Sequence, residues 1–196
     1  MVATPEQTMR DRIVAVAGEM TTSTGWATVT MARLAESVGV SRQTVYNEVG
    51  PKPALAETMV LTELARFLTL VEAAFDSEPE NVSRAIEQAV TNVLTYAQDN
   101  NLLHAVVSAT HGADTELLPL LATNAVSLLE TAKAVVSARV TAYEPAIEPS
   151  HLDPAIDMIV RVVLSHVMQP SATPARTGAD VAWLARQVLK GPRPRA

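Results

Sequence analysis

Apolar residues recur at helical spacing along nearly the whole 196-residue chain. Near the N-terminus, Ile13, Val16, Ala17 and Met20 fall at i, i+3, i+4 and i+7, which places them on one face of an α-helix. Residues 31–38 repeat the same spacing. No stretch of useful length alternates apolar and polar residues as a half-buried strand does, and no internal repeat is visible. The pattern therefore predicts an all-α fold of about nine helices.

Capping residues and helix breakers set the expected helix boundaries. Thr30 and Ser41 have side-chain oxygens suited to N-caps, and Gly39 and Gly50 suit the backbone at helix ends. Proline-rich segments further along the chain serve as connectors. The expected helices cover residues 5–22, 30–38, 41–48, 53–75, 79–99, 101–110, 115–142, 152–168 and 178–190.

Composition and charge exclude several classes of protein. The chain has no cysteine, so it has neither a disulfide framework nor a thiolate metal site. No apolar run approaches the ~20 residues that a membrane-spanning helix needs, and no leader segment is evident, so we expect a cytoplasmic protein that makes no membrane contact. The net charge of −6 lies entirely in residues 53–196, because the basic and acidic side chains of residues 1–52 cancel. A neutral N-terminal segment leaves room for a locally positive face that binds DNA.

Residues 30–49 meet the physical requirements of a helix-turn-helix. Ala35 is small enough to let two helices cross closely, Gly39 permits a tight turn, and Val45 can anchor the second helix from inside. The polar side chains left facing outward on that second helix are Ser41, Arg42, Gln43, Thr44, Tyr46 and Asn47. Such a helix fits the major groove of DNA, which is ~12 Å wide. A solvated surface helix with no binding role is the alternative interpretation.

The outward side chains have chemistry suited to DNA. Arg42 can donate two hydrogen bonds to guanine, and Gln43 can pair in the same way with adenine. Thr44 and Tyr46 carry hydroxyl groups for phosphate oxygens, and the Thr44 methyl group suits thymine. Lys52 lies just before the next helix, where an ammonium group and a helix N-terminus can share one phosphate.

The stretch TVTMARLAESVGVSRQTVYNEVGPKPALAETMV resembles the DNA-binding signature of the TetR family of bacterial transcriptional regulators. The matching residues are Thr30, Leu34, Ala35, Gly39, Val40, Ser41, Thr44, Val45, Tyr46, Gly50, Lys52 and Leu55. The resemblance covers roughly residues 8–60. It implies a helix-turn-helix DNA-binding domain at residues 1–52 and a helical regulatory domain at residues 53–196. The candidate DNA-binding residues are Thr30, Ser41, Arg42, Gln43, Thr44, Tyr46, Asn47 and Lys52.

The same resemblance implies a homodimer that binds a palindromic operator in double-stranded DNA. Family members dimerise through their last two long helices, which correspond here to residues 152–168 and 178–190. In the first of these, Val162 lies off the main apolar stripe, and in the second Trp183 and Leu184 add a further apolar surface. A helix that is apolar on more than one side must bury both sides, which is consistent with a partner subunit.

The resemblance also implies a ligand cavity in the regulatory domain, and helices rich in Leu, Val and Ala suit a mainly apolar small molecule. Polar residues on these apolar helices are candidate anchors for its polar end, and the rest of the segment supplies apolar walls. The candidate ligand-binding residues are Leu68, Asn92, Tyr96, His104, Ser108, Asn124, Leu128 and His166. No cofactor, metal ion or catalytic residue is expected.

Two other functions are alternatives to a ligand-responsive transcriptional regulator, which in this family is usually a repressor. An enzyme is disfavoured because the spacing of His104, His111, His151 and His166 matches no metal or acid–base motif, and no phosphate-binding loop is present. A helical carrier of lipophilic molecules would explain the apolar regulatory segment. It would leave the polar residues of the short helix without a role.

Overall fold

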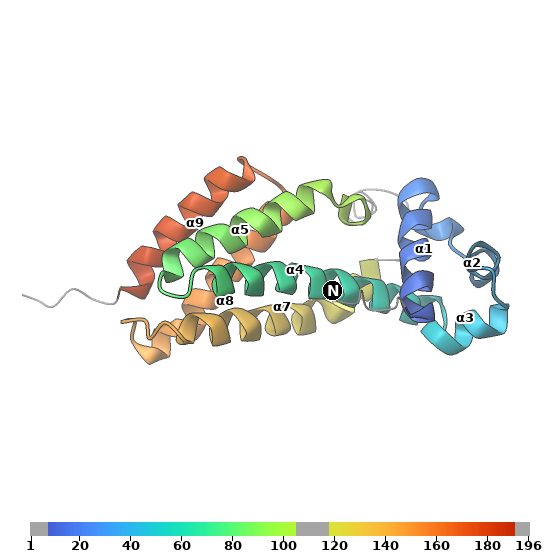
Figure 1. Ribbon diagram of the computed structural model, residues 1–196, viewed down its shortest axis with the longest axis horizontal. Coiled ribbons are helices and arrows are strands. Elements are labelled where there is room, and N and C mark those ends of the chain that lie inside the picture. The colour runs from blue at the N-terminus through green and yellow to red at the C-terminus, as the bar shows by residue number, and fades with distance from the viewer. Residues whose placement is uncertain (1–7, 105–117, 191–196) are drawn as a thin grey trace, which may run out of the picture. The chain divides into compact units, whose positions relative to one another are not determined.

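The computed structural model describes residues 8–104 and 118–190. Every regular element in those ranges is helical, so the predicted all-α fold class is confirmed (Figure 1). The elements are α1 (Met9–Thr24), the 3₁₀-helix η1 (Trp26–Thr28), α2 (Met31–Val38), α3 (Arg42–Val49), α4 (Lys52–Ser77), α5 (Val82–Asp99), α7 (Leu118–Thr141), α8 (Pro149–Met168) and α9 (Pro174–Leu189). Residues 101–104 are helical as well. None of the described helices combines the length and apolarity of a membrane-spanning segment.

The described residues pack into two compact units. The first contains residues 8–63, 100–104 and 118–125, and the second contains residues 64–99 and 126–190. Helix α4 runs without a break from the first unit into the second. The predicted division after residue 52 concerns function rather than packing, and it stays a prediction.

The first unit is built around the apolar faces of α1, α2 and α3. Ile13, Leu34, Val45 and Leu55 are fully buried in its core, and Leu102 packs against that core from residues 101–104. Helix α1 begins with a capping box, in which Thr8 and Asp11 each accept a hydrogen bond from the other's backbone N–H. Helix capping of this kind and one shared core hold α1, α2 and α3 in a fixed arrangement.

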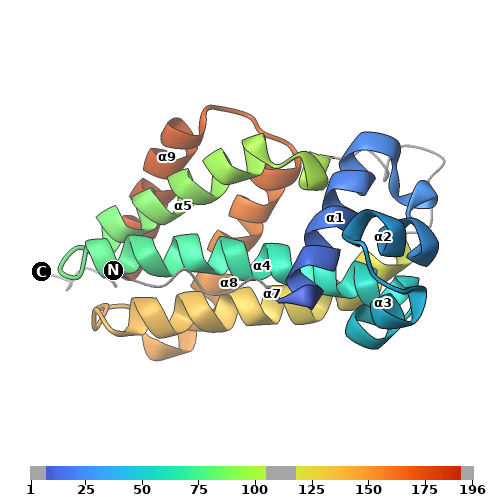
Figure 2. The same ribbon diagram turned by 45° about the vertical axis from the view of Figure 1, so that its right-hand side comes forward.

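In the second unit, α5 and α9 run antiparallel and side by side (Figure 1 and Figure 2). On α9 the contact is made by the small buried residues Gly178 and Ala182, which face Glu87 and Thr91 and Ser83 of α5. Small side chains let the two backbones approach closely. A Cβ atom built on Gly178 would lie 2.9 Å from the carbonyl oxygen of Glu87, which is closer than real Cβ contacts.

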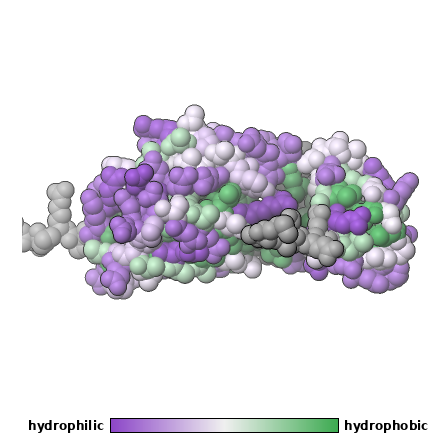
Figure 3. All heavy atoms as spheres, viewed as in Figure 1, coloured by the Kyte–Doolittle hydropathy of each residue, from purple (hydrophilic) through white to green (hydrophobic). Residues whose placement is uncertain are grey.

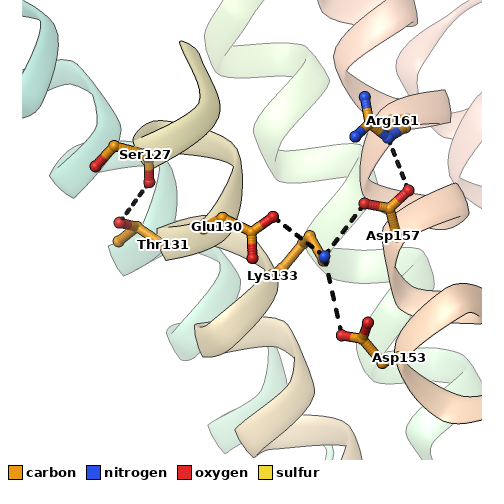
Figure 4. A network of polar contacts seen from close by, with 7 residues as sticks. All are labelled: Ser127, Glu130, Thr131, Lys133, Asp153, Asp157 and Arg161. Carbon is orange, nitrogen blue, oxygen red and sulfur yellow. Dashed lines mark hydrogen bonds and ion pairs between the residues drawn. The ribbon is translucent and has the colours of Figure 1, made fainter. Parts of the chain in front are cut away.

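A network of ion pairs joins α7 to α8 in the same unit (Figure 4). The Lys133 side chain is only 12% exposed, and its Nζ lies 3.3 Å from carboxylate oxygens of both Glu130 and Asp157 and 3.9 Å from Asp153. Arg161 Nε donates to Asp157 Oδ2 at 2.7 Å.

On the side seen in Figure 3, hydrophilic residues cover most of the second unit, with smaller apolar areas between them.

We expect Gly178→Ala to lower the free energy of unfolding by ~1–3 kcal/mol, because the added methyl group must displace the Glu87 carbonyl and the Thr91 side chain. In an unobstructed helix the same change raises stability. Chemical denaturation measures both the sign and the size of the effect. Thr91→Ala in the Gly178→Ala background should recover part of the loss, and a stabilised single variant would contradict this packing.

The Asp157 network should make stability depend on pH in a narrow acid range. The hydrogen bond from Arg161 lowers the pKa of Asp157, and Lys133 adds to this. A lowered pKa in the folded state stabilises the fold above the unfolded value of about 3.9 and loses that effect as pH falls through the folded value. We therefore expect Asp157→Asn to melt at a lower temperature than the natural chain at pH 7. The difference should shrink below about pH 4, and a difference that stays constant to pH 3 would refute the assignment.

Candidate functional site

The turn between α2 and α3 has the geometry predicted from the sequence. Thr30 caps α2, with its Oγ1 accepting from the Arg33 N–H at 3.2 Å. Gly39 ends that helix in the left-handed region, at φ 76° and ψ 36°. Ser41 caps α3, with its Oγ accepting from the Thr44 N–H at 3.0 Å. Because both caps and the glycine are local, this short sequence alone determines how the two helices join.

Helix α3 is held from inside and presents polar groups outside. Val45 and Val49 are 0% and 3% exposed, so they anchor the helix to the core of the first unit. The Arg42 guanidinium lies 5.7 Å from the centre of the exposed Tyr46 ring. Gln43 Nε2 donates to Asn47 Oδ1 at 2.9 Å.

The remaining predicted DNA contacts of this segment are Thr30, Ser41 and Thr44. Ser41 and Thr30 are exposed, although their side-chain oxygens also serve as caps. Thr44 is half-buried, and its Oγ1 shares a hydrogen bond of 2.8 Å with Ser41. The predicted residues of α3 therefore form one continuous polar face.

Lys52 begins α4, where the sequence placed a phosphate contact. Its Nζ lies 4.9 Å from the centre of the Trp26 ring, and Trp26 itself is 3% exposed. An ammonium group at this distance from an indole face is attracted by the ring. Sequence reasoning missed Trp26, which lies between the expected helices at 5–22 and 30–38, because its contact with Lys52 joins residues far apart in the sequence. An aromatic residue directly after Gly25 was the available signal.

The second unit contains an apolar cavity of about 140 Å³. Helices α4, α5, α7, α8 and α9 all contribute to its wall, and every described side chain that lines it is aliphatic or a phenylalanine. Its deepest members include Phe75, Ile156 and Val140, which are almost completely buried. Such a surface can bind hydrocarbon but offers a polar group no partner.

The predicted ligand residues are only partly assembled at this cavity. Leu68 lines it. Tyr96 instead packs edge-on against Phe67, with ring centres 5.2 Å apart, and Asn92 accepts a hydrogen bond from Gln88 at 2.9 Å. His166 shares hydrogen bonds with Ser171 and with the backbone oxygen of its own helix. These three side chains are not among the residues that line the cavity.

The other four predicted ligand residues either do not line the cavity or lie outside the part of the chain that the structure describes. His104 is exposed, and Leu128 is half-buried one helical turn before Ala132, which does line the cavity. Ser108 lies outside the described residues, and so does the side chain of Asn124. Sequence reasoning expected apolar walls but, apart from Leu68, listed none of the individual lining residues as ligand contacts. They are Leu64, Phe67, Val71, Phe75, Ile86, Ala89, Val90, Val93, Ala132, Val136, Val140, Ile156, Ile159, Val160, Val163, Leu164, Val167 and Leu189. Polar residues on apolar helices were the expected ligand contacts, whereas the described lining is apolar throughout.

Within the described ranges, no group of three His, Cys, Asp or Glu side chains lies close enough together to hold a metal ion.

Comparison with known proteins identifies the family. Residues 81–187, more than half of the chain, match the family described as "Bacterial Tetracyclin repressor, C-terminal domain". The chain belongs to the TetR family. The HTH-type transcriptional regulator AlkX of Mycobacterium tuberculosis is 26% identical over 176 residues, which cover 90% of this chain and 82% of that protein.

Solved structures of other regulators share the fold. The repressor AlkX from a Dietzia species, implicated in biodegradation of n-alkanes, has a TM-score of 0.73 at 23% identity, covering 95% of this chain and 98% of that one. The fatty acid degradation regulator FadR from Bacillus halodurans has a TM-score of 0.57 at 17% identity, covering 94% and 96%.

Family membership confirms the functional class that the sequence predicted: the chain is a ligand-responsive, DNA-binding transcriptional regulator. Members of the family bind DNA operators and small molecules as dimers. The similar proteins are transcriptional regulators rather than enzymes. A carrier of lipophilic molecules without a DNA-binding role is therefore not favoured.

Proposed function

We propose that this chain is a cytoplasmic repressor without catalytic activity. As a homodimer it binds a palindromic operator, and a mainly apolar small molecule releases it. The observation that carries the DNA-binding role is α3, whose buried Val45 and Val49 fix a helix with Arg42, Gln43, Tyr46 and Asn47 exposed on the other side. A rigidly mounted polar helix of this kind is what reading base edges in the major groove requires.

Base reading and phosphate binding are assigned to different residues. Arg42 and Gln43, in the first turn of α3, are the proposed readers of guanine and adenine. Thr30, Ser41, Thr44, Tyr46 and Lys52 are the proposed phosphate contacts, and Asn47 extends the base-reading face. The contacts of Arg42 with Tyr46 and of Gln43 with Asn47 limit the conformations of the free side chains. Because these side chains are already partly ordered, binding costs less side-chain conformational entropy.

The proposed dimer interface is the exposed apolar surface of α8 and α9. Met158 and Val162 on α8 are 68% and 36% exposed, and Trp183 and Leu184 on α9 are 59% and 40% exposed. Both helices also bury an opposite face inside their own unit. A second copy that covers these side chains would form a symmetric interface, because the same patch meets itself across a two-fold axis.

The apolar cavity is the proposed ligand site. Its lining supports a ligand that is hydrocarbon over most of its length, in agreement with the predicted ligand class. The similar proteins implicated in n-alkane biodegradation and fatty acid degradation support an alkyl chain in particular. Of the predicted ligand residues, Leu68 is the one that lines this cavity.

Helix α4 is the proposed connection between ligand and DNA. Lys52 stands at its first residue, and Leu64, Phe67 and Leu68 of the same unbroken helix line the cavity. A ligand that displaces these residues also reorients the start of the helix. Both recognition helices of a dimer must stay about 34 Å, or a multiple of that distance, apart to engage the two half-sites. A coupling of ~1–3 kcal/mol between ligand and operator is expected.

Arg42→Ala should weaken binding to the selected operator by ~1–3 kcal/mol and relax preference at particular base pairs, because it removes a bidentate contact. Lys52→Ala should weaken binding to all sequences more evenly and reduce the salt slope by about one. Electrophoretic shifts on the operator and on single-base variants, over a range of salt concentrations, separate the two effects. Unchanged affinity and unchanged base preference in Arg42→Ala would show that α3 does not read the DNA.

Trp183→Ala should weaken dimerisation by more than about tenfold, because a large exposed aromatic side chain is lost from both sides of the interface. Sedimentation equilibrium measures the dissociation constant. Leu61→Ala is the matched control, since Leu61 is 50% exposed but belongs to the first unit. Equal dissociation constants in the two variants would argue against this interface.

A further inference from the structure

The cavity in the second unit has a property that separates one end of a ligand from the other. We propose that it accepts the unfunctionalised end of a hydrocarbon chain, inserted tail first, and rejects a chain that carries a polar group at that end. The inference rests on the proposed role of this cavity as the ligand site. It adds the chemistry of the buried end, which decides among ligands that are equally long.

The first argument is the lining. The described side chains around the cavity come from five helices, and none of them carries a nitrogen or oxygen atom. Their backbone groups lie in helices, where N–H and C=O groups already bond to one another. A hydroxyl group placed among them would lose its hydrogen bonds to water and find no replacement.

The second argument is that the polar side chains near the cavity already have partners. Among the described residues, no buried side-chain nitrogen or oxygen lacks a hydrogen-bond partner. The lysine and arginine side chains described on α7 and α8 have carboxylate partners: Lys133 pairs with Asp157, Arg139 with Asp76, and Arg161 with Asp157. An anionic group would have to compete with these carboxylates.

The third argument is size. At about 140 Å³ the cavity is close to the ~150 Å³ of an apolar cavity that stays dry and holds one benzene molecule. It therefore has room for roughly six carbon atoms. Pockets that enclose a whole drug-sized ligand measure ~300–1,000 Å³. Only one end of a longer chain fits, so any polar head group remains outside this space.

A pair of alcohols of equal length tests the proposal directly. In 1-octanol the hydrocarbon end can enter while the hydroxyl group stays outside, but in 1,8-octanediol either end brings a hydroxyl group into the cavity. Isothermal titration of the full chain should give a dissociation constant for the diol about 100-fold or more above that for the alcohol.

A variant that supplies a polar partner distinguishes this cause from the general solubility of the diol. Val90→Thr replaces a lining methyl group by a hydroxyl with little change of shape. The buried Thr21 of this chain shows that such a hydroxyl can donate to the carbonyl four residues earlier, at 2.7 Å. Its lone pairs then remain for the diol, so the diol-to-alcohol ratio should fall about tenfold. Val163→Thr serves if Val90→Thr does not fold, and Val126→Thr, on an exposed residue outside the lining, is the control.

The possible outcomes lead to different conclusions. A large ratio that falls in Val90→Thr and persists in Val126→Thr supports tail-first binding. Equal affinity for alcohol and diol overturns the inference but leaves the proposed ligand site intact. A ratio that does not respond to a threonine in the lining also overturns it. If neither compound binds, both the inference and the proposed ligand site are wrong.

Discussion

Close contact between small aliphatic side chains determines how the helices of this protein pack. Aromatic residues make up only 4% of the chain, so few large side chains are available to separate neighbouring helices. Ala35 lies in the buried face of α2, and Gly178 and Ala182 lie where α9 meets α5. Interiors are filled at nearly crystalline density, so helices with small side chains must approach closely. In the first unit this packing supports the proposed DNA-reading helix, and in the second it encloses an apolar cavity.

The helix-turn-helix could be predicted residue by residue because its determinants are local. Thr30, Gly39 and Ser41 act through hydrogen bonds or backbone angles within a few residues of themselves, and each has the structural role that its type indicates. The long helices were also predictable from their spacing, although α8 begins at Pro149 and α9 at Pro174, earlier than expected. Proline in the first turn is compatible with a helix and extends it toward the connector.

The cavity could not be located from the sequence in the same way. Its wall combines residues from five helices, and which face of each helix meets the others depends on packing across long sequence separations. Polar residues such as Asn92 and His166 were natural candidates for ligand contacts, but neighbours on their own helices already bond them. A polar group on an apolar helix is thus a poor guide to a binding site when local partners are available. Trp26 was overlooked for a related reason, since its contact with Lys52 joins segments that the sequence separates.

The placement of the two tryptophans gives the protein a built-in optical readout. Trp26 is buried in the first unit beside Lys52, and Trp183 is largely exposed on α9. Indole fluorescence shifts to longer wavelength with exposure to water, so the two residues emit in different parts of one spectrum while no second subunit covers Trp183. The shorter-wavelength emission of Trp26 reports the surroundings of the Lys52 ammonium group. The longer-wavelength emission of Trp183 reports whether a second subunit covers α9. Events at the two units can therefore be followed in a single unlabelled sample.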